Sequence, residues 1–215
     1  MSTKIEWCNM TWNPVMGCKT ECPYCYAKKI NDRFNYIKNW NDPEWRETGF
    51  NKKFPHKPSR IFVNSMSDIA YWKPEWMQSV LDKIKEYPQH TFLFLTKSPK
   101  IYNDFYFKEN CWLGITITNQ KQMSKFENNP LNISLDDKYK LFLSIEPMQE
   151  QIELSVVPDW IIIGAETGNR KNKIIPKKEW IEEIIEHCKY INIPIFMKNN
   201  LASVWRDKLI QEYPK

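Results

Sequence analysis

Three cysteines stand close together near the start of the chain: Cys18, Cys22 and Cys25 have a C-x3-C-x2-C spacing, and the aromatic Tyr24 precedes the third. Cysteine thiolates hold iron–sulfur clusters, and a [4Fe–4S] cluster normally takes four of them. A triad leaves one iron open to a small molecule. The spacing therefore predicts a cluster-binding loop with one open iron.

Zinc and disulfide bonding are the alternatives for this triad. A structural zinc site has four closed ligands, whereas the three histidines, His56, His90 and His187, are single and distant in the sequence. A disulfide framework needs an oxidising compartment, whereas the chain has only six cysteines in 215 residues and a polar start without a secretory segment. Zinc or another metal remains the main alternative to a cluster.

The other three cysteines are scattered, and no second cluster is expected: Cys8, Cys111 and Cys188. Hydrophobic residues make up 42% of the chain, and the absence of any apolar run near 18 residues argues against a membrane span. The net charge of +5 permits a polyanionic partner without requiring one. We expect a cytoplasmic protein with a single domain over residues 1–215.

Short apolar runs alternate with helical patterns along the chain, which is typical of repeated β–α units around a parallel sheet. The predicted strands are residues 60–64, 91–96, 112–117, 140–145, 160–164 and 193–197, and a further strand precedes the cysteine loop. The predicted helices are residues 24–36, 73–87, 99–108, 120–128, 177–190 and 201–213. The fold class is α/β, and six or seven such units fit a partial or nearly closed TIM-like (β/α) barrel.

Polar residues follow every one of the six apolar runs, at the strand ends where α/β barrels place their chemistry. They are Asn64, Ser65, Ser67, Asp68, Thr96, Lys97, Thr116, Thr118, Asn119, Ser144, Glu146, Glu166, Thr167, Lys198 and Asn199. A single Thr or Asp there is more often a helix cap or a turn residue. The ionisable groups Lys97, Glu146, Glu166 and Lys198 are the catalytic candidates, because only pairing or a ligand offsets their desolvation.

Together these motifs carry a resemblance that covers nearly the whole chain. The spacing of the cysteine loop and Tyr24 resemble the signature of radical S-adenosylmethionine (SAM) enzymes. The ordered set of motifs is similar to a three-cysteine-motif family of phage and bacterial proteins, distantly similar to spore photoproduct lyase: residues 4–7, 11–14, 63–68, 95–99, 112–114, 143–147, 163–168 and 194–198. The resemblance supplies a cofactor and a fold, not a substrate.

The resemblance implies a radical SAM enzyme with a barrel of that type. Cys18, Cys22 and Cys25 would hold a [4Fe–4S] cluster, SAM would chelate the open iron, and its reductive cleavage would yield a 5′-deoxyadenosyl radical that abstracts hydrogen from a substrate. Further expected SAM-binding residues are Tyr24, Ser65, Ser67, Asp68, Thr116, Thr118 and Asn119. The usual Gly-Gly-Glu of the superfamily is replaced here by residues 65–68. An electron donor such as flavodoxin or ferredoxin is also implied.

The substrate stays open between a nucleic-acid base or nucleotide, a peptide and a small metabolite, and a partner protein can supply docking. Glu166 and Lys198 follow consecutive late strands, so we expect them to face substrate and to be placed for pairing with each other. The competing function is an iron–sulfur or zinc-stapled nucleic-acid-binding protein without catalysis.

Overall fold

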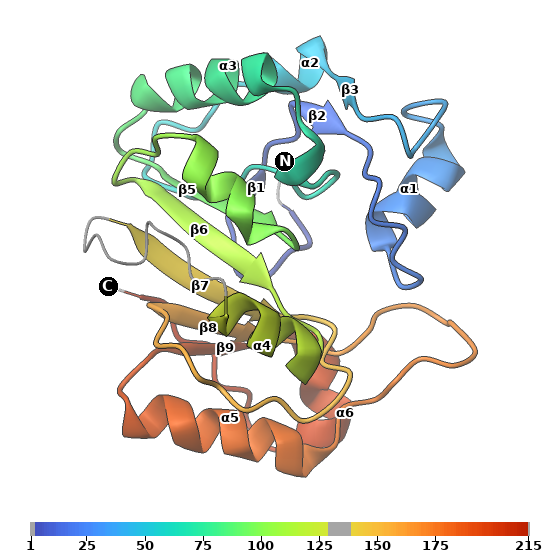
Figure 1. The fold of residues 1–215 in the computed structure, drawn as a ribbon, viewed down its shortest axis with the longest axis vertical. Helices are drawn as coiled ribbons and strands as arrows, with labels where there is room; N and C mark the ends of the chain where they lie inside the picture. Colours follow the sequence, from blue (N-terminus) through green and yellow to red (C-terminus); the bar gives the residue numbers. More distant parts are fainter. Residues whose placement is uncertain (1–2, 129–138, 215) are drawn as a thin grey trace. The chain divides into compact units, whose positions relative to one another are not determined.

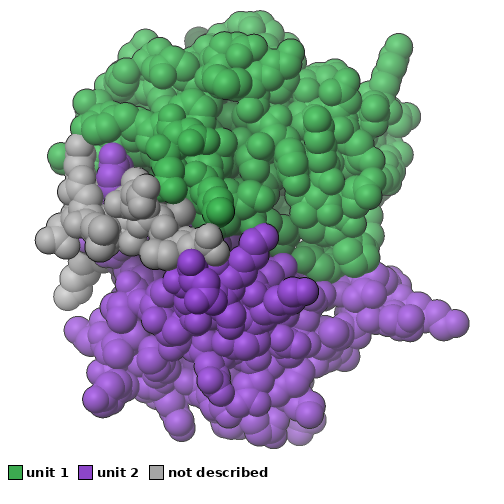
Figure 2. Space-filling model, viewed as in Figure 1, with its two compact units in different colours: residues 1–113 green, residues 114–215 purple. Residues whose placement is uncertain are grey.

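The computed structural model describes residues 3–128 and 139–214 and divides into two compact units, residues 1–113 and 114–215 (Figure 2). Helices and strands alternate in both units (Figure 1). The boundary between the units falls inside one strand, β6 (Cys111–Thr116). Each unit is therefore described by itself, and the expectation of one domain stays a prediction.

The first unit carries a parallel run of strands in the order β1-β4-β5-β6. Its elements are β1 (Met10–Thr11), β2 (Val15–Met16), α1 (Tyr26–Phe34), β3 (Glu44–Trp45), α2 (Glu47–Phe50), β4 (Arg60–Phe62), the 3-10 helix η1 (Ile69–Tyr71), α3 (Pro74–Lys85), β5 (Thr91–Thr96) and the 3-10 helix η2 (Pro99–Asp104). Ile61 of β4 lies opposite Met10 on one side and Phe92 on the other. The short β2 and β3 pair antiparallel as a separate ribbon.

The second unit continues from β6 in the order β6-β7-β8-β9. Its elements are α4 (Gln120–Glu127), β7 (Lys140–Ile145), β8 (Trp160–Ile163), α5 (Lys178–Tyr190), β9 (Ile195–Met197), the 3-10 helix η4 (Asn199–Leu201) and α6 (Ala202–Trp205). Leu143, Ile161 and Ile195 lie opposite one another in parallel register. In the described part of each unit these strands pair in parallel, so the predicted α/β fold with a parallel sheet is confirmed.

Burial explains why these segments become strands and helices. The strand β8 is buried along its whole length, as expected for a parallel strand covered on both faces. The helix α5 buries Ile181, Ile184, Ile185 and Cys188, a spacing of three and four residues that places all of them on one face. The helix α3 begins at Pro74, in the first turn where proline costs no hydrogen bond, and buries the same kind of stripe.

Two predicted helices differ from the structure. Residues 99–104 form the 3-10 helix η2, which ends before residue 105. The predicted helix over residues 201–213 is wrong beyond α6, because Arg206 turns left-handed at φ 64° and ends it. The following segment instead runs beside β9, where Met197 N donates to Ile210 O at 2.7 Å and Glu212 N to Ile195 O at 2.9 Å. Sheet pairing thus takes precedence over helix propensity here.

In the part of the chain that the structure describes, every helix is too short or too polar to cross a bilayer.

Candidate metal centre

The cysteine loop of the first unit connects β2 to α1, and its entry depends on Gly17. This glycine has φ +108°, and a Cβ there would lie 2.8 Å from Pro43 Cα and 2.9 Å from Trp40 O, both backbone atoms. The next residue, Cys18, donates its N–H to the same Trp40 O at 2.8 Å. The loop therefore enters through a close backbone approach that only glycine allows.

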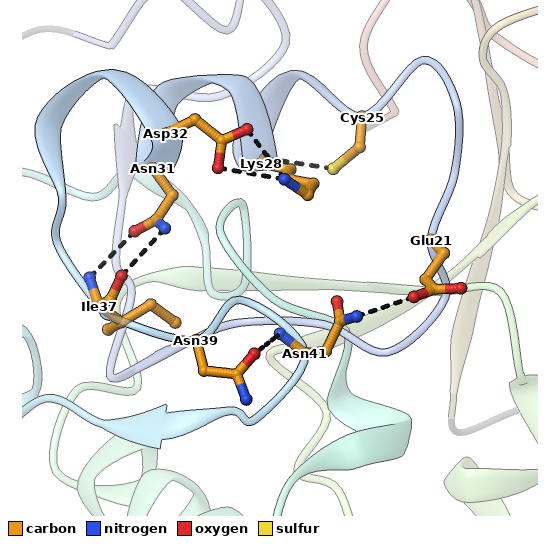
Figure 3. Close-up of polar contacts among 8 residues, drawn as sticks. All are labelled: Glu21, Cys25, Lys28, Asn31, Asp32, Ile37, Asn39 and Asn41. Carbon is orange, nitrogen blue, oxygen red and sulfur yellow. Dashed lines mark hydrogen bonds and ion pairs between the residues drawn. The ribbon is translucent and has the colours of Figure 1, made fainter.

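Cys25 ends the loop and begins the helix α1. Its Sγ accepts a hydrogen bond from Lys28 N at 3.3 Å, which caps one of the free amides of the first turn (Figure 3). Its own N–H donates to Cys22 O at 3.0 Å, so the C-x2-C half of the motif is a closed turn. The third cysteine is thus the N-cap residue of α1.

Polar contacts hold the loop and the segment after α1 together (Figure 3). The Asn31 side chain accepts from Ile37 N at 3.0 Å and donates to Ile37 O at 3.1 Å, which fixes the return of the chain after the helix. Glu21, in a left-handed conformation at φ 52°, accepts from Asn41 Nδ2 at 2.8 Å. The loop between Cys18 and Cys22 is therefore anchored at its tip.

The thiols of this loop are partly buried and chemically free. All six cysteines of the chain are unpaired, and Cys18 and Cys25 pack against an apolar cluster that includes Trp40 and Met66. Burial raises the pKa of Cys18, although hydrogen bonds to Thr20 oppose the shift, and it raises the pKa of Cys22, although Lys97 opposes it. Burial therefore favours the neutral form of the Cys18 and Cys22 thiols, and a bound metal would displace their protons.

Lys97, at the end of β5, places a positive charge beside this loop. Its Nζ is buried and has no hydrogen-bond acceptor among the described residues. The ammonium lies 5.4 Å from the centre of the Tyr24 ring. Burial lowers the pKa of Lys97, and charge interactions with Cys22, Asp68, Cys18 and Cys25, the cysteines as thiolates, oppose this in that order. Lys97 and Tyr24 of the predicted set thus lie together at the cysteine loop.

Asp68 ties the end of β5 to the loop after β4. Its Oδ1 accepts from Thr96 Oγ1 at 2.5 Å and from Ala70 N at 3.0 Å, and its Oδ2 accepts from Lys97 N at 3.0 Å. Three donors occupy most of the carboxylate's acceptor capacity. Asp68 therefore has a clear structural role, and its contact with a SAM ammonium stays a prediction.

The two serines of the same segment also have protein partners. Ser65 Oγ donates to Asn13 Oδ1 at 3.1 Å, and Ser67 Oγ accepts from Trp72 Nε1 at 3.0 Å. Asn64 joins the segment to β5 by accepting from Leu95 N at 3.0 Å. These contacts hold residues 64–68 rigidly beside the cysteine loop, and Gly17 bridges directly to Ser67.

Three observations bear on whether this loop fits a metal group. Among the described residues, no three His, Cys, Asp or Glu side chains are already gathered as a metal site. The three free thiols nevertheless share one anchored loop, and the buried ammonium of Lys97 lies beside them without an acceptor. Metal ions bind cysteine as the thiolate, so binding at this loop would release the thiol protons. The donor set therefore fits an anionic group held by Cys18, Cys22 and Cys25.

The predicted SAM-binding residues of the second unit mostly serve the helix α4. Asn119 caps the helix by accepting from Gln122 N at 3.0 Å, and Thr118 N donates to Gln122 Oε1 at 2.7 Å. Thr116 lies buried at the end of β6. For Thr118 and Asn119 the structure shows the capping role that polar residues after a strand commonly have.

Glu146 and Lys198 form an ion pair in the second unit. Lys198 Nζ donates to Glu146 Oε1, and both side chains are largely buried, with exposed fractions of 14% and 23%. Gly164 lies beside them, since a Cβ there would be 3.0 Å from Lys198 Cδ and 3.3 Å from Glu146 Cγ. The glycine thus leaves room for the pair at the ends of neighbouring strands.

Glu166 contacts Arg170, a residue absent from the predicted set. Arg170 donates to Glu166 through Nε at 2.8 Å and through Nη2 at 2.7 Å, and the Glu166 side chain is only 1% exposed. This hydrogen bonding raises the pKa of Arg170. The ion pairs that the structure shows are Glu166 with Arg170 and Lys198 with Glu146, and a pairing of Glu166 with Lys198 stays a prediction. Residues 164–170 form a loop, so no helical spacing in the sequence could have indicated this pair.

Comparison with known proteins gives one match. The model of a family described as "Protein of unknown function (DUF5131)" matches residues 2–209. No curated protein and no solved structure matches the chain.

Proposed function

We propose a function for this chain, which belongs to the DUF5131 family of proteins of unknown function, from the chemistry of its cysteine loop. The chain is a radical SAM enzyme that binds a [4Fe–4S] cluster through Cys18, Cys22 and Cys25 and uses SAM as its second cofactor. The observation that carries the proposal is the anchored loop of three free thiols, with Cys25 at a helix N-terminus and a buried ammonium alongside.

A [4Fe–4S] cluster held by Cys18, Cys22 and Cys25 would supply one-electron reduction of SAM, and through it hydrogen-atom abstraction from a substrate. The chain contributes binding, orientation and exclusion of water. Trp40 and Met66 cover the thiols with apolar surface, and Tyr24 is placed next to the last ligand for contact with a cofactor ring. Asp68 and Thr96 hold the strand end that carries Lys97.

The proposal extends to fold, location and partners. We take the parallel sheet to belong to a partial (β/α)6–7 barrel of the radical SAM type. A cytoplasmic location suits six free thiols, because that compartment keeps cysteines reduced. A one-electron donor of the flavodoxin or ferredoxin kind is required. Glu146, Glu166 and Lys198 remain candidates for substrate contacts.

One surface feature favours the competing reading of a metal-stapled nucleic-acid-binding protein. Phe34 and Tyr36 are both exposed and stack on each other with ring centroids 5.7 Å apart, and the Arg33 guanidinium lies 5.1 Å from the Phe34 ring centre. Exposed aromatic faces beside cationic groups can stack on single-stranded bases. The same surface also suits a nucleic-acid substrate for the enzyme.

Anaerobic reconstitution with iron and sulfide tests the proposal. We expect a [4Fe–4S] absorption and electron paramagnetic resonance signature with about four irons per chain. Addition of SAM and a strong reductant should then release 5′-deoxyadenosine. Stoichiometric zinc without iron in protein purified without oxygen would contradict the cluster and favour the competing reading.

Two variants of Cys25 separate its ligand role from its capping role. Cys25→Ser keeps an oxygen cap on α1 and should lose the cluster without loss of stability. Cys25→Ala should lose the cluster and also about 0.5–2 kcal/mol of unfolding free energy, the usual cost of removing a cap. Cys111→Ser and Cys188→Ser, which change buried thiols outside the loop, are the controls that should keep the cluster.

A further inference from the structure

The buried ammonium of Lys97 is the least satisfied charge of the cysteine-loop region. Its Nζ has no acceptor among the described residues, and the ring of Tyr24 at 5.4 Å offers only a cation–π contact. Such a contact is weak compared with the hydration that a buried ammonium loses. A charge in this position needs an anionic partner.

The ammonium cannot easily leave this position, because its backbone is held on both sides. Asp68 accepts from Lys97 N at 3.0 Å and from Thr96 Oγ1 at 2.5 Å, and Thr96 Oγ1 accepts in turn from Ser98 N at 3.0 Å. The Asp68 carboxylate also caps the 3-10 helix η1 by accepting from Ala70 N, so the end of β5 and the segment before η1 are held together. Lys97 is therefore placed by structure rather than by a chance rotamer.

The ammonium lies at the cysteine loop, because the ring it contacts belongs to Tyr24, which stands between Cys22 and Cys25 in the chain. As thiolates, the three cysteines of this loop would be negative charges near Lys97. The carboxylate of Asp68 is already engaged by three donors, which leaves the sulfurs as the available acceptors. Three thiolates around a cluster core carry net negative charge and present sulfur acceptors.

We propose that Lys97 is a positioning residue of the metal centre, whose ammonium donates to a sulfur of the thiolate-held cluster and offsets its negative charge. This inference rests on the proposed function only in requiring that the triad binds a metal group. It assigns Lys97 to the cofactor rather than to substrate orientation or proton transfer. Hydrogen bonds to cluster sulfurs and nearby charge both set the reduction potential of such centres.

Lys97→Met tests the inference, because it removes the charge and keeps a long unbranched side chain. In metal-free protein the variant should unfold at equal or higher urea concentration than the wild type, since an unpaired buried charge is gone. In reconstituted protein it should release iron to a chelator about tenfold faster, as expected for the loss of a hydrogen bond between charged partners. Its reduction potential should also shift to a more negative value.

Lys100→Met, three residues along and exposed, is the matched control and should leave all three measurements unchanged. A reconstituted Lys97→Met protein with wild-type iron release and potential would overturn this inference and leave the proposed function intact. A marked loss of stability in the metal-free variant would also overturn it, because the ammonium would then serve the protein alone. A wild-type chain that takes up neither iron nor zinc would overturn the proposed function and this inference together.

Discussion

Replacement of Gly17 by alanine should disable the cysteine loop more than any other single-methyl change near it. The residue has φ +108°, and an added Cβ would lie 2.8 Å and 2.9 Å from two backbone atoms. The conformation alone costs a non-glycine residue about 1–3 kcal/mol. Contacts this short cannot be relieved by rotating a side chain, and overpacking adds about 1–3 kcal/mol. We therefore expect a total loss of at least about 2 kcal/mol of unfolding free energy.

Gly168→Ala is the control, because Gly168 also has a positive φ of 86° but lies exposed. It should show the cost of the conformation without that of crowding. The assay is urea unfolding of metal-free protein, followed by tryptophan fluorescence, together with iron uptake on reconstitution. Gly17→Ala should lower both stability and iron uptake, since the shifted backbone carries Cys18 away from Trp40 O. Equal stability losses in the two variants, with full iron uptake in both, would refute this reasoning.

Three further predictions concern groups whose titration the structure shifts. Burial lowers the pKa of His90, so the neutral side chain contributes to stability above its ordinary pKa of about 6.5, and this contribution is lost as the pH falls below that value. In His90→Phe the urea midpoint of unfolding should therefore depend less on pH over that range. Arg170→Ala should destabilise the protein, because the buried Glu166 carboxylate loses its bidentate partner, whereas the exposed Lys171→Ala should leave the urea midpoint unchanged. Alkylation at pH 8, read by mass spectrometry, should spare Cys8, Cys111 and Cys188, because burial raises the pKa of each to about 12. All six cysteines should react only when the protein is unfolded in urea.

The strands were predictable because a parallel strand needs a short, continuous apolar run, and each run in this sequence is bounded by polar residues. The run over residues 160–163 is fully buried as β8, as its composition indicates. The helix predicted over residues 201–213 failed for a reason that local sequence does not contain. Residues 210–212 find hydrogen-bond partners on β9, and that pairing depends on tertiary structure.

For the candidate site, too, the sequence predicted local features but not contacts that depend on tertiary structure. Cysteine spacing identified the triad directly, because ligand spacing on one loop is a local property. The burial of Lys97 and its lack of an acceptor are tertiary properties, so the sequence placed this residue at a strand end without indicating which group it faces. The pairing of Lys198 with Glu146 likewise depends on Gly164, whose missing side chain makes the space for it.

Because Cys25 Sγ both caps α1 and belongs to the triad, the opening rate of the first helical turn reports the state of the sulfur. A metal-bound thiolate is a stronger acceptor than a neutral thiol, so the Lys28 amide should exchange its hydrogen more slowly when the triad is loaded. The helix therefore acts as a built-in gauge of occupancy, readable by hydrogen–deuterium exchange without any knowledge of the substrate.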